Sequence, residues 1–301
     1  MLNTESALPP GERSTLSRAR EGGGWRIAAR WGARHGPRWW LRYSPPFFGA
    51  LGWAVLPRER RRVRRNLTQI IGGTSSWALW KAEIATFANY ARCFAEGLAA
   101  GRVEAMAAIA SLSDASRLES SLAGGRGAVI ATAHVGPWDA AAQILGRDIR
   151  RSVTAVMAPE RILAAREVHD EVRSRAGVRV HHSGQRTLGS LDLLRALRAG
   201  EIVVVQLDRF PPDGRAMSAT LFGQSVEVPL GPFLLAGLAG VPVVPVFVWR
   251  RDFFDYRGEV GEPLCLPRRP TETQLREVVE QATSMMEGFI RRHPTQWFHF
   301  S

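Results

Sequence analysis

A histidine and an aspartate stand five positions apart in the segment His134-Val-Gly-Pro-Trp-Asp139. The apolar run at residues 127–133 predicts a buried strand before His134, and the alanine-rich run after Asp139 predicts a helix. A histidine so placed takes a proton from a hydroxyl or amine when a carboxylate holds its ring in one tautomer and stabilises the imidazolium. We therefore identify His134 and Asp139 as a candidate catalytic dyad, although a strand end followed by an acidic helix start is also a common structural pattern.

The elements that must position this pair follow from an alternation of strands and helices after residue 127. Apolar runs predict strands around Val129 and at residues 153–157, 178–181, 202–206 and 243–248. Helical patterns predict helices from Trp138, at residues 159–176 and 188–198, after Gly231 and at about 272–292, with a long loop from Asp208. Such alternation predicts an α/β fold with a mixed, largely parallel sheet flanked by helices. Sites in such sheets form beyond the carboxyl ends of the strands, where His134 and Asp208 both fall.

The chain divides into three predicted parts, and its 301 residues fit one large domain with an N-terminal appendage. Residues 1–24 are polar and rich in proline and glycine, which predicts a disordered tail. Residues 25–74 form an amphipathic, basic, membrane-associating helical region. Residues 75–301 form the α/β domain, which opens with a helical stretch at roughly 75–122.

The net charge of +12 is concentrated near the N-terminus, because residues 1–65 hold 14 arginines and 4 glutamates, which gives +10 by subtraction. The uncharged aromatic segment Tyr43–Leu56 runs directly into the polybasic segment Arg58–Arg65. An apolar segment beside a polybasic one fits an anionic membrane surface. A spanning helix needs about 20 residues, and this shorter segment contains Pro45 and Pro46, so we expect a peripheral or re-entrant anchor. The alternative is a core helix with a solvated basic face.

Cys93 and Cys265 are the only cysteines, and they lie far apart without metal-ligand spacing. We therefore expect neither a disulfide framework nor a structural zinc site. We also expect the protein to occupy a reducing compartment. The first 24 residues lack the apolar core of a signal peptide.

Three further segments follow the dyad in a defined order. The first, residues 195–209, reads as a helix, a glycine and a strand that ends in Asp208-Arg209. The second, residues 221–232, leads into a helix of small residues, and the third is Val241-Pro-Val-Val-Pro-Val246. Together with the dyad, at this spacing, they resemble the glycerolipid and lipid A acyltransferase superfamily. The bacterial branch of lipid A biosynthesis lauroyl/myristoyl acyltransferases, which includes the phosphatidylinositol mannoside acyltransferases, is the more similar. Residues 61–67 and 95–96 resemble the same branch, so the resemblance extends from about residue 40 to the C-terminus.

The resemblance implies an enzyme that moves a fatty acyl chain from an acyl thioester to a hydroxyl or amine of a lipid acceptor. The donor would be an acyl thioester of acyl carrier protein or of coenzyme A, and no cofactor besides this co-substrate would be needed. His134 would act as the general base, oriented by Asp139, and no acyl-enzyme is required. Backbone N–H groups near Gly136, or the Arg209 guanidinium, would stabilise the oxyanion. The chain contains no Gly-x-Ser-x-Gly elbow for a serine nucleophile.

The candidate substrate-binding residues are Gly136, Trp138, Arg173, Asp208, Arg209 and Arg215. Asp208 and Arg209 follow a buried strand, where a strand-end salt bridge is the alternative. Arg173 occupies the place of a recurring family arginine and would contact phosphate, unless it lies on a solvated helix face. Arg215 ends a segment that we interpret as a turn carrying cations. One departure from the branch is Pro137, which stands where asparagine is usual, and we expect Trp297 to be a core or membrane contact.

Two other functions remain open. The first is a catalytically silent membrane-binding protein of the same fold, which intact His134 and Asp139 oppose and Pro137 leaves open. The second is nucleic-acid binding by the arginine-rich region, where aromatic residues interleave with arginine. The uncharged Pro-Pro-Phe-Phe run favours lipid, so we expect no nucleic-acid partner. We predict an enzyme at the cytoplasmic face of the bacterial inner membrane, held there as a peripheral or monotopic protein.

Overall fold

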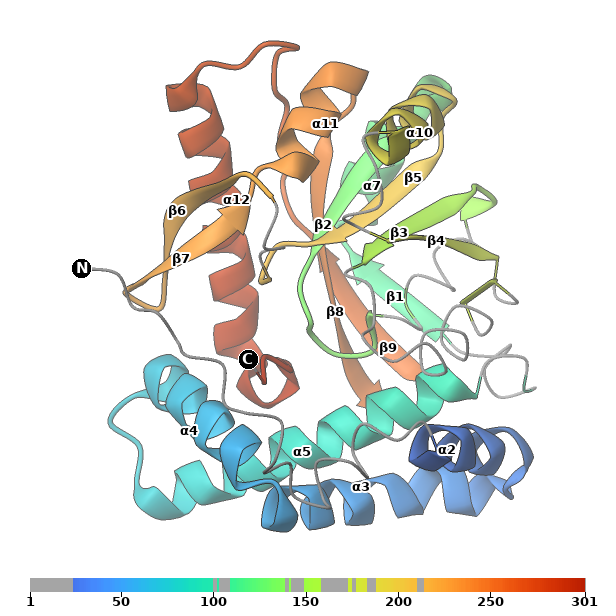
Figure 1. Ribbon diagram of the computed structural model, residues 1–301, viewed down its shortest axis with the longest axis vertical. Coiled ribbons are helices and arrows are strands. Elements are labelled where there is room, and N and C mark those ends of the chain that lie inside the picture. The colour runs from blue at the N-terminus through green and yellow to red at the C-terminus, as the bar shows by residue number, and fades with distance from the viewer. Residues whose placement is uncertain are drawn as a thin grey trace, which may run out of the picture.

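The computed structural model describes residues 24–99, 102, 109–138, 141, 149–157, 173–174, 177–182, 188–209 and 214–300. Within these residues a seven-stranded sheet has the order β1-β9-β8-β2-β5-β3-β4 (Figure 1). Its strands are β1 Ile109–Ser113, β2 Ala128–Thr132, β3 Val153–Met157, β4 Val178–His182, β5 Ile202–Gln206, β8 Val243–Asp252 and β9 Asp255–Val260. Neighbouring strands run parallel, except that β8 and β9 are antiparallel. The predicted mixed, largely parallel sheet is therefore confirmed.

Helices cover both faces of this sheet. They are α7 Ala115–Leu122, α10 Leu188–Arg198, α11 Gly231–Ala239 and α12 Glu272–Arg292, with short 3-10 turns at η1 Ala123–Gly125 and η2 Pro294–Gln296. Successive residues of a strand point to opposite faces, so the central strands fill two separate cores. One core joins Val129 and Val203 to Phe233 of α11 and Phe289 of α12. The other joins Ile130 and Ile202 to Leu118 of α7. All five residues of β2 are buried, as expected for a central parallel strand covered on both sides.

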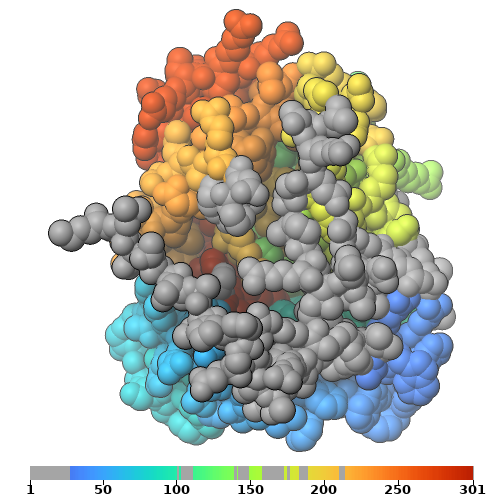
Figure 2. Space-filling view, viewed as in Figure 1, coloured from blue at the N-terminus to red at the C-terminus, as the bar shows by residue number. Residues whose placement is uncertain are grey.

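The N-terminal helices form a layer of their own below the sheet in Figure 1, and in Figure 2 their blue and cyan side chains make up that end of the molecule. They are α2 Gly24–His35, α3 Arg38–Val55, α4 Pro57–Ile71 and α5 Ser76–Leu98. Helix α5 packs against α3 and α4. Buried Glu83 of α5 accepts a hydrogen bond from Trp53 Nε1 of α3 at 3.1 Å and pairs with Arg64 Nε of α4 at 3.1 Å. One buried carboxylate therefore joins three helices, through one hydrogen bond and one ion pair that offset the cost of burying its charge.

Helix α3 runs through Pro45 and Pro46 without interruption. In the part of the chain that the structure describes, no helix has the length and apolar character needed to cross a bilayer.

Three predictions of secondary structure are wrong. The stretch at 75–122 is not continuous helix, because α5 ends at Leu98 and Ile109–Ser113 forms edge strand β1. The predicted loop after Asp208 contains an antiparallel hairpin of β6 Ala216–Leu221 and β7 Gln224–Pro229. Strand β8 extends beyond residue 248 and returns as β9. Strand β1 pairs with β9, far along the chain, so its local pattern carries no sign of its partner.

Three predictions fall mainly on residues outside those described. They are the disordered tail at 1–24, of which only Gly24 is described; the helix from Trp138, of which residues 139–140 and 142–148 are not described; and the helix at 159–176, of which only residues 173–174 are described.

Candidate active site

The register of two central strands brings His134 and Asp208 together. Thr132 of β2 pairs with Gln206 of β5 at the carboxyl ends of these parallel strands, and Leu207 N–H donates to Thr132 O at 2.8 Å. His134 and Asp208 each lie two residues further along, so they leave the sheet side by side. This is the end of a parallel sheet at which binding sites form.

His134 and Asp208 form a hydrogen-bonded pair. His134 Nδ1 lies 2.8 Å from Asp208 Oδ1, and the His134 backbone N–H donates to both carboxylate oxygens at 3.1 Å. The Asp208 side chain is fully buried, whereas 16% of the His134 side chain is exposed. Because an ionised carboxylate only accepts hydrogen bonds, Nδ1 carries the proton and Nε2 keeps its lone pair. The ring thus has one nitrogen held by the protein and one able to accept a proton.

The Asp208 carboxyl is held in its ionised form. Burial raises its pKa, but the charge of His134 and the hydrogen bond from its ring outweigh burial, together with smaller contributions from His299 and from Trp297. The net pKa of Asp208 therefore lies well below its ordinary value. An ionised Asp208 at neutral pH favours the His134 tautomer with the proton on Nδ1.

The loop after His134 requires glycine at position 136. Gly136 has a φ of +51°, and a Cβ there would overlap the Val248 carbonyl oxygen. Its N–H donates to Gln296 O at 2.8 Å, and Val135 N–H donates to Ala133 O at 2.7 Å. These two backbone donors are therefore engaged within the protein, which fixes the path of the loop.

Trp138 lies beside His134, whereas Asp139 lies outside the described residues. The Trp138 ring meets the His134 ring edge to face, with 5.9 Å between centroids. Arg173, whose exposed fraction is 8%, has its Cζ 5.7 Å from the centroid of the Trp138 ring. A cation over an indole face is attracted by the ring electrons. The structure therefore brings His134, Trp138 and Arg173 into one cluster, and the role predicted for Asp139 stays a prediction.

The remaining two predicted arginines differ in their relation to the site. Arg209 follows Asp208 and is exposed, and its Nη2 donates to Phe298 O at 3.3 Å. Arg215 is exposed and precedes β6. Among the described contacts, none joins the Arg215 side chain to His134 or to the other predicted site residues.

The C-terminal segment, which we define as residues 296–300, also contributes to the site. Trp297 forms an antiparallel bridge with Val135, and Phe298 N–H donates to His134 O at 2.7 Å. Trp297 Nε1 donates to Asp208 Oδ2 at 3.0 Å. The sequence analysis missed this contribution, because the aromatic run carries no local sign of a pairing with a loop so far back in the chain.

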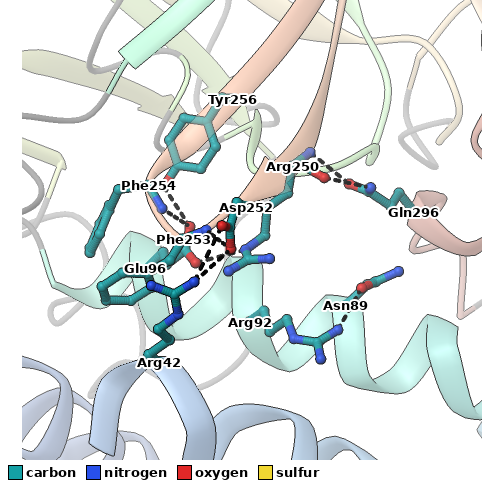
Figure 3. A network of polar contacts seen from close by, with 10 residues as sticks. All are labelled: Arg42, Asn89, Arg92, Glu96, Arg250, Asp252, Phe253, Phe254, Tyr256 and Gln296. Carbon is teal, nitrogen blue, oxygen red and sulfur yellow. Dashed lines mark hydrogen bonds and ion pairs between the residues drawn. The ribbon is translucent and has the colours of Figure 1, made fainter. Parts of the chain in front are cut away.

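A second buried carboxylate ties the N-terminal layer to the sheet (Figure 3). Glu96 of α5 accepts hydrogen bonds from Arg250 Nε at 2.7 Å and from Tyr256 Oη at 2.8 Å. Burial raises the pKa of Glu96, and the Arg250 charge opposes this shift. Arg250 in turn exchanges two backbone hydrogen bonds with the Gln296 side chain, at 2.8 and 3.0 Å. The network therefore reaches the C-terminal segment and, through Gln296, the loop after His134.

Comparison with protein families gives a match to the family described as bacterial lipid A biosynthesis acyltransferase, over residues 17–301. A search among curated proteins gave no match.

Proposed function

Since the chain belongs to the bacterial lipid A biosynthesis acyltransferase family, we propose that it transfers a fatty acyl chain from an acyl thioester to a hydroxyl or amine of a lipid A-like acceptor. The match spans nearly the whole chain, from residue 17 to residue 301, which makes the protein an acyltransferase by family. The donor, the catalytic residues and the place of action are the finer parts of the proposal.

The observation that carries the mechanism is the hydrogen bond between His134 Nδ1 and buried Asp208. In the proposed reaction, His134 Nε2 removes the proton from the acceptor hydroxyl as the oxygen attacks the thioester carbonyl. The tetrahedral intermediate then collapses, the carbon–sulfur bond breaks, and the His134 imidazolium returns the proton to the departing sulfur. An ester and a free thiol result, and no bond to the enzyme forms. The negative charge of Asp208 stabilises the imidazolium while it exists.

The orienting role is proposed for Asp208, and that of Asp139 remains a separate prediction. Asp208 accepts hydrogen bonds from the backbone N–H and from the ring Nδ1–H of His134. Because its pKa is held low, its carboxylate is ionised at neutral pH. Asp139 falls outside the described residues, so substitution of each carboxylate in turn is the test that distinguishes them.

We assign oxyanion stabilisation to Arg209. The backbone N–H groups of His134, Val135 and Gly136 already donate to acceptors within the protein. Arg209 follows Asp208 directly, and its guanidinium has N–H groups beyond the one that donates to Phe298 O. A cation close to the developing oxyanion lowers the barrier to attack. Buried Arg173 beside Trp138 is proposed to contact a phosphate or diphosphate of a substrate.

The proposed place of action is the cytoplasmic face of the bacterial inner membrane, where α3 rests on the lipid surface. Trp39, Tyr43, Phe47, Leu51 and Val55 recur every four residues along α3, and each has an exposed fraction of 48% or more. Successive residues at this spacing are neighbours on a helix surface, and together they form one continuous ridge. An exposed row of large apolar side chains that includes tryptophan and tyrosine fits the interface of a bilayer. Helix α4, which follows, carries six arginines and one glutamate and supplies attraction to anionic lipid or to an acidic acyl donor.

The enzymatic proposal is tested with purified protein, a lipid A precursor and two alternative donors, acyl carrier protein and coenzyme A thioesters of one fatty acid. The expected result is a precursor heavier by one acyl group, with thiol release that requires the precursor. Release of thiol at the same rate without precursor would indicate a thioesterase. No transfer from either donor, with intact binding to liposomes, would favour the catalytically silent membrane-binding protein.

A further inference from the structure

The C-terminal segment lies between the loop after His134 and the N-terminal helices. On one side, Gln296 O accepts the Gly136 N–H at 2.8 Å and Phe298 N–H donates to His134 O at 2.7 Å. On the other side, two residues of α4 hold its carbonyl groups. Asn66 Nδ2 donates to His299 O at 2.7 Å and Arg62 Nη1 donates to Phe300 O at 2.9 Å. The segment is therefore fixed along both edges, which fixes the direction of its side chains.

Within this segment the Trp297 indole reaches the carboxylate that holds His134. Its Nε1 donates to Asp208 Oδ2 at 3.0 Å, while Asp208 Oδ1 lies 2.8 Å from His134 Nδ1. Trp297 has an exposed fraction of 7%, and its ring packs on Phe222 with 5.6 Å between centroids. Rotation of the Asp208 carboxylate about its terminal bond would break the bonds to His134 and to Trp297 together. The two donors therefore hold the carboxylate plane in one orientation.

The chemistry of the indole suits this position. A tryptophan N–H donates one hydrogen bond and has neither an acceptor nor a charge. It therefore does not compete with Asp208 for the His134 proton. A lysine or arginine in its place would form an ion pair with Asp208 and weaken the attraction between Asp208 and the imidazolium. A neutral donor fixes the carboxylate and leaves its charge available to His134.

We propose that Trp297 is a positioning residue of the catalytic centre, whose indole N–H fixes the second oxygen of Asp208 so that the first stays on His134 Nδ1. The proposal rests on the function proposed above, in which Asp208 orients His134. Trp297 acts through Asp208 and touches no substrate. Its removal therefore lowers kcat and leaves KM for the acceptor unchanged.

The test is the substitution Trp297→Phe, which removes the N–H and keeps an aromatic ring against Phe222. We expect kcat to fall about 10- to 100-fold, the range for a lost hydrogen bond to a charged group. In an Asp208→Asn background the same substitution is expected to lower kcat no further, because two residues that act through one contact are not additive. Trp249→Phe, which replaces an indole stacked on the His293 ring with a phenyl ring, is the matched control and is expected to keep wild-type kcat.

A second variant covers the case in which Trp297→Phe fails to fold. Incorporation of 3-benzothienylalanine at position 297 replaces the N–H with sulfur at nearly constant ring volume, and the same 10- to 100-fold fall in kcat is expected. Wild-type kcat in either variant, with Asp208→Asn impaired, overturns the role of Trp297 alone. An equal fall in the wild-type and Asp208→Asn backgrounds also overturns it, because the effect would then bypass Asp208. Wild-type kcat in Asp208→Asn overturns the underlying mechanism and this proposal together.

Discussion

The substitution Asp208→Asn tests how His134 is made basic. The wild-type carboxylate accepts the backbone N–H and Nδ1 of His134 and Nε1 of Trp297. An asparagine offers one oxygen and one NH₂ group in the same place. If the oxygen faces His134, the NH₂ group meets the Trp297 N–H and two donors oppose each other. If the NH₂ group faces His134, it donates to Nδ1 and moves the ring proton to Nε2, where it blocks proton acceptance.

The expected size of the effect follows from these two arrangements. In the first, His134 keeps its tautomer and loses the neighbouring negative charge, which at about 4 Å and an effective dielectric constant of about 20 is worth about 4 kcal/mol, or about 10³-fold in rate. In the second, the base is lost, as when a buried aspartate that orients a catalytic histidine is replaced and turnover falls about 10⁴-fold. We therefore expect kcat to fall about 10³- to 10⁴-fold. In the first arrangement stability also falls by at least about 1–3 kcal/mol, since the asparagine NH₂ group and the Trp297 N–H are left buried and unpaired.

The assay is thiol release in the presence of the lipid A precursor, read together with the mass of the acylated product. Asp192→Asn, on the exposed side of α10, is the matched control and is expected to keep activity within about twofold, because exposed ion pairs contribute little. Asp139→Asn is measured beside it. A kcat for Asp208→Asn within about threefold of wild type would show that Asp208 does not orient His134. If Asp139→Asn fell about 10³-fold at the same time, the orienting carboxylate would be Asp139.

The other predictions concern the membrane face, the loop after His134, the oxyanion and pH. Leu51→Glu on α3 is expected to lower binding to anionic liposomes at least about tenfold, because charge is costly at the apolar interface. Leu191→Glu on α10, which is similarly exposed and far from α3 in Figure 1, should bind as wild type. Equal binding by both variants would contradict the membrane contact proposed for α3. Gly136→Ala is expected to lose roughly 2 kcal/mol or more of unfolding free energy in urea, from its positive φ and the overlap with a carbonyl oxygen; unchanged stability would show that the loop has another path. Arg209→Leu is expected to lower kcat about 10²-fold with folding intact, and an unchanged kcat would remove it from the mechanism. Because the pKa of Asp208 is lowered on folding, its contribution to stability is present above its unfolded pKa of about 3.9 and is lost as pH falls through the lower folded value. The difference in unfolding free energy between wild type and Asp208→Asn should therefore be constant above about pH 5 and shrink below pH 4. A difference independent of pH would contradict the lowered pKa of Asp208.

Local patterns predicted the parts of this fold in which sequence neighbours interact. Strand β2 and helices α10 and α12 follow from apolar runs and helical spacing, and His134 and Asp208 were placed correctly at the ends of strands. Strand β1 was missed, because the pairing that makes Ile109–Ser113 a strand is with β9. Composition cannot reveal such a partner.

The same limit explains which site residues sequence could reveal. His134 stands out because its residue type and its place after a buried strand both favour catalysis. The partner of its ring depends on the register of β2 with β5, and only that register brings Asp208 within hydrogen-bonding distance. Trp297 gave no signal, because its proposed role depends on an antiparallel bridge to Val135, in the loop after His134. Residue type indicated the proposed base, and tertiary pairing supplied the groups that hold its ring.

The most direct test of the account is acyl transfer by the His134→Ala variant to the lipid A precursor under single-turnover conditions. We expect the rate to fall at least about 10²-fold, with unchanged liposome binding and a cooperative unfolding transition that shows the variant to be folded. Transfer at the wild-type rate by a folded His134→Ala protein would contradict the account, because it would place the base elsewhere.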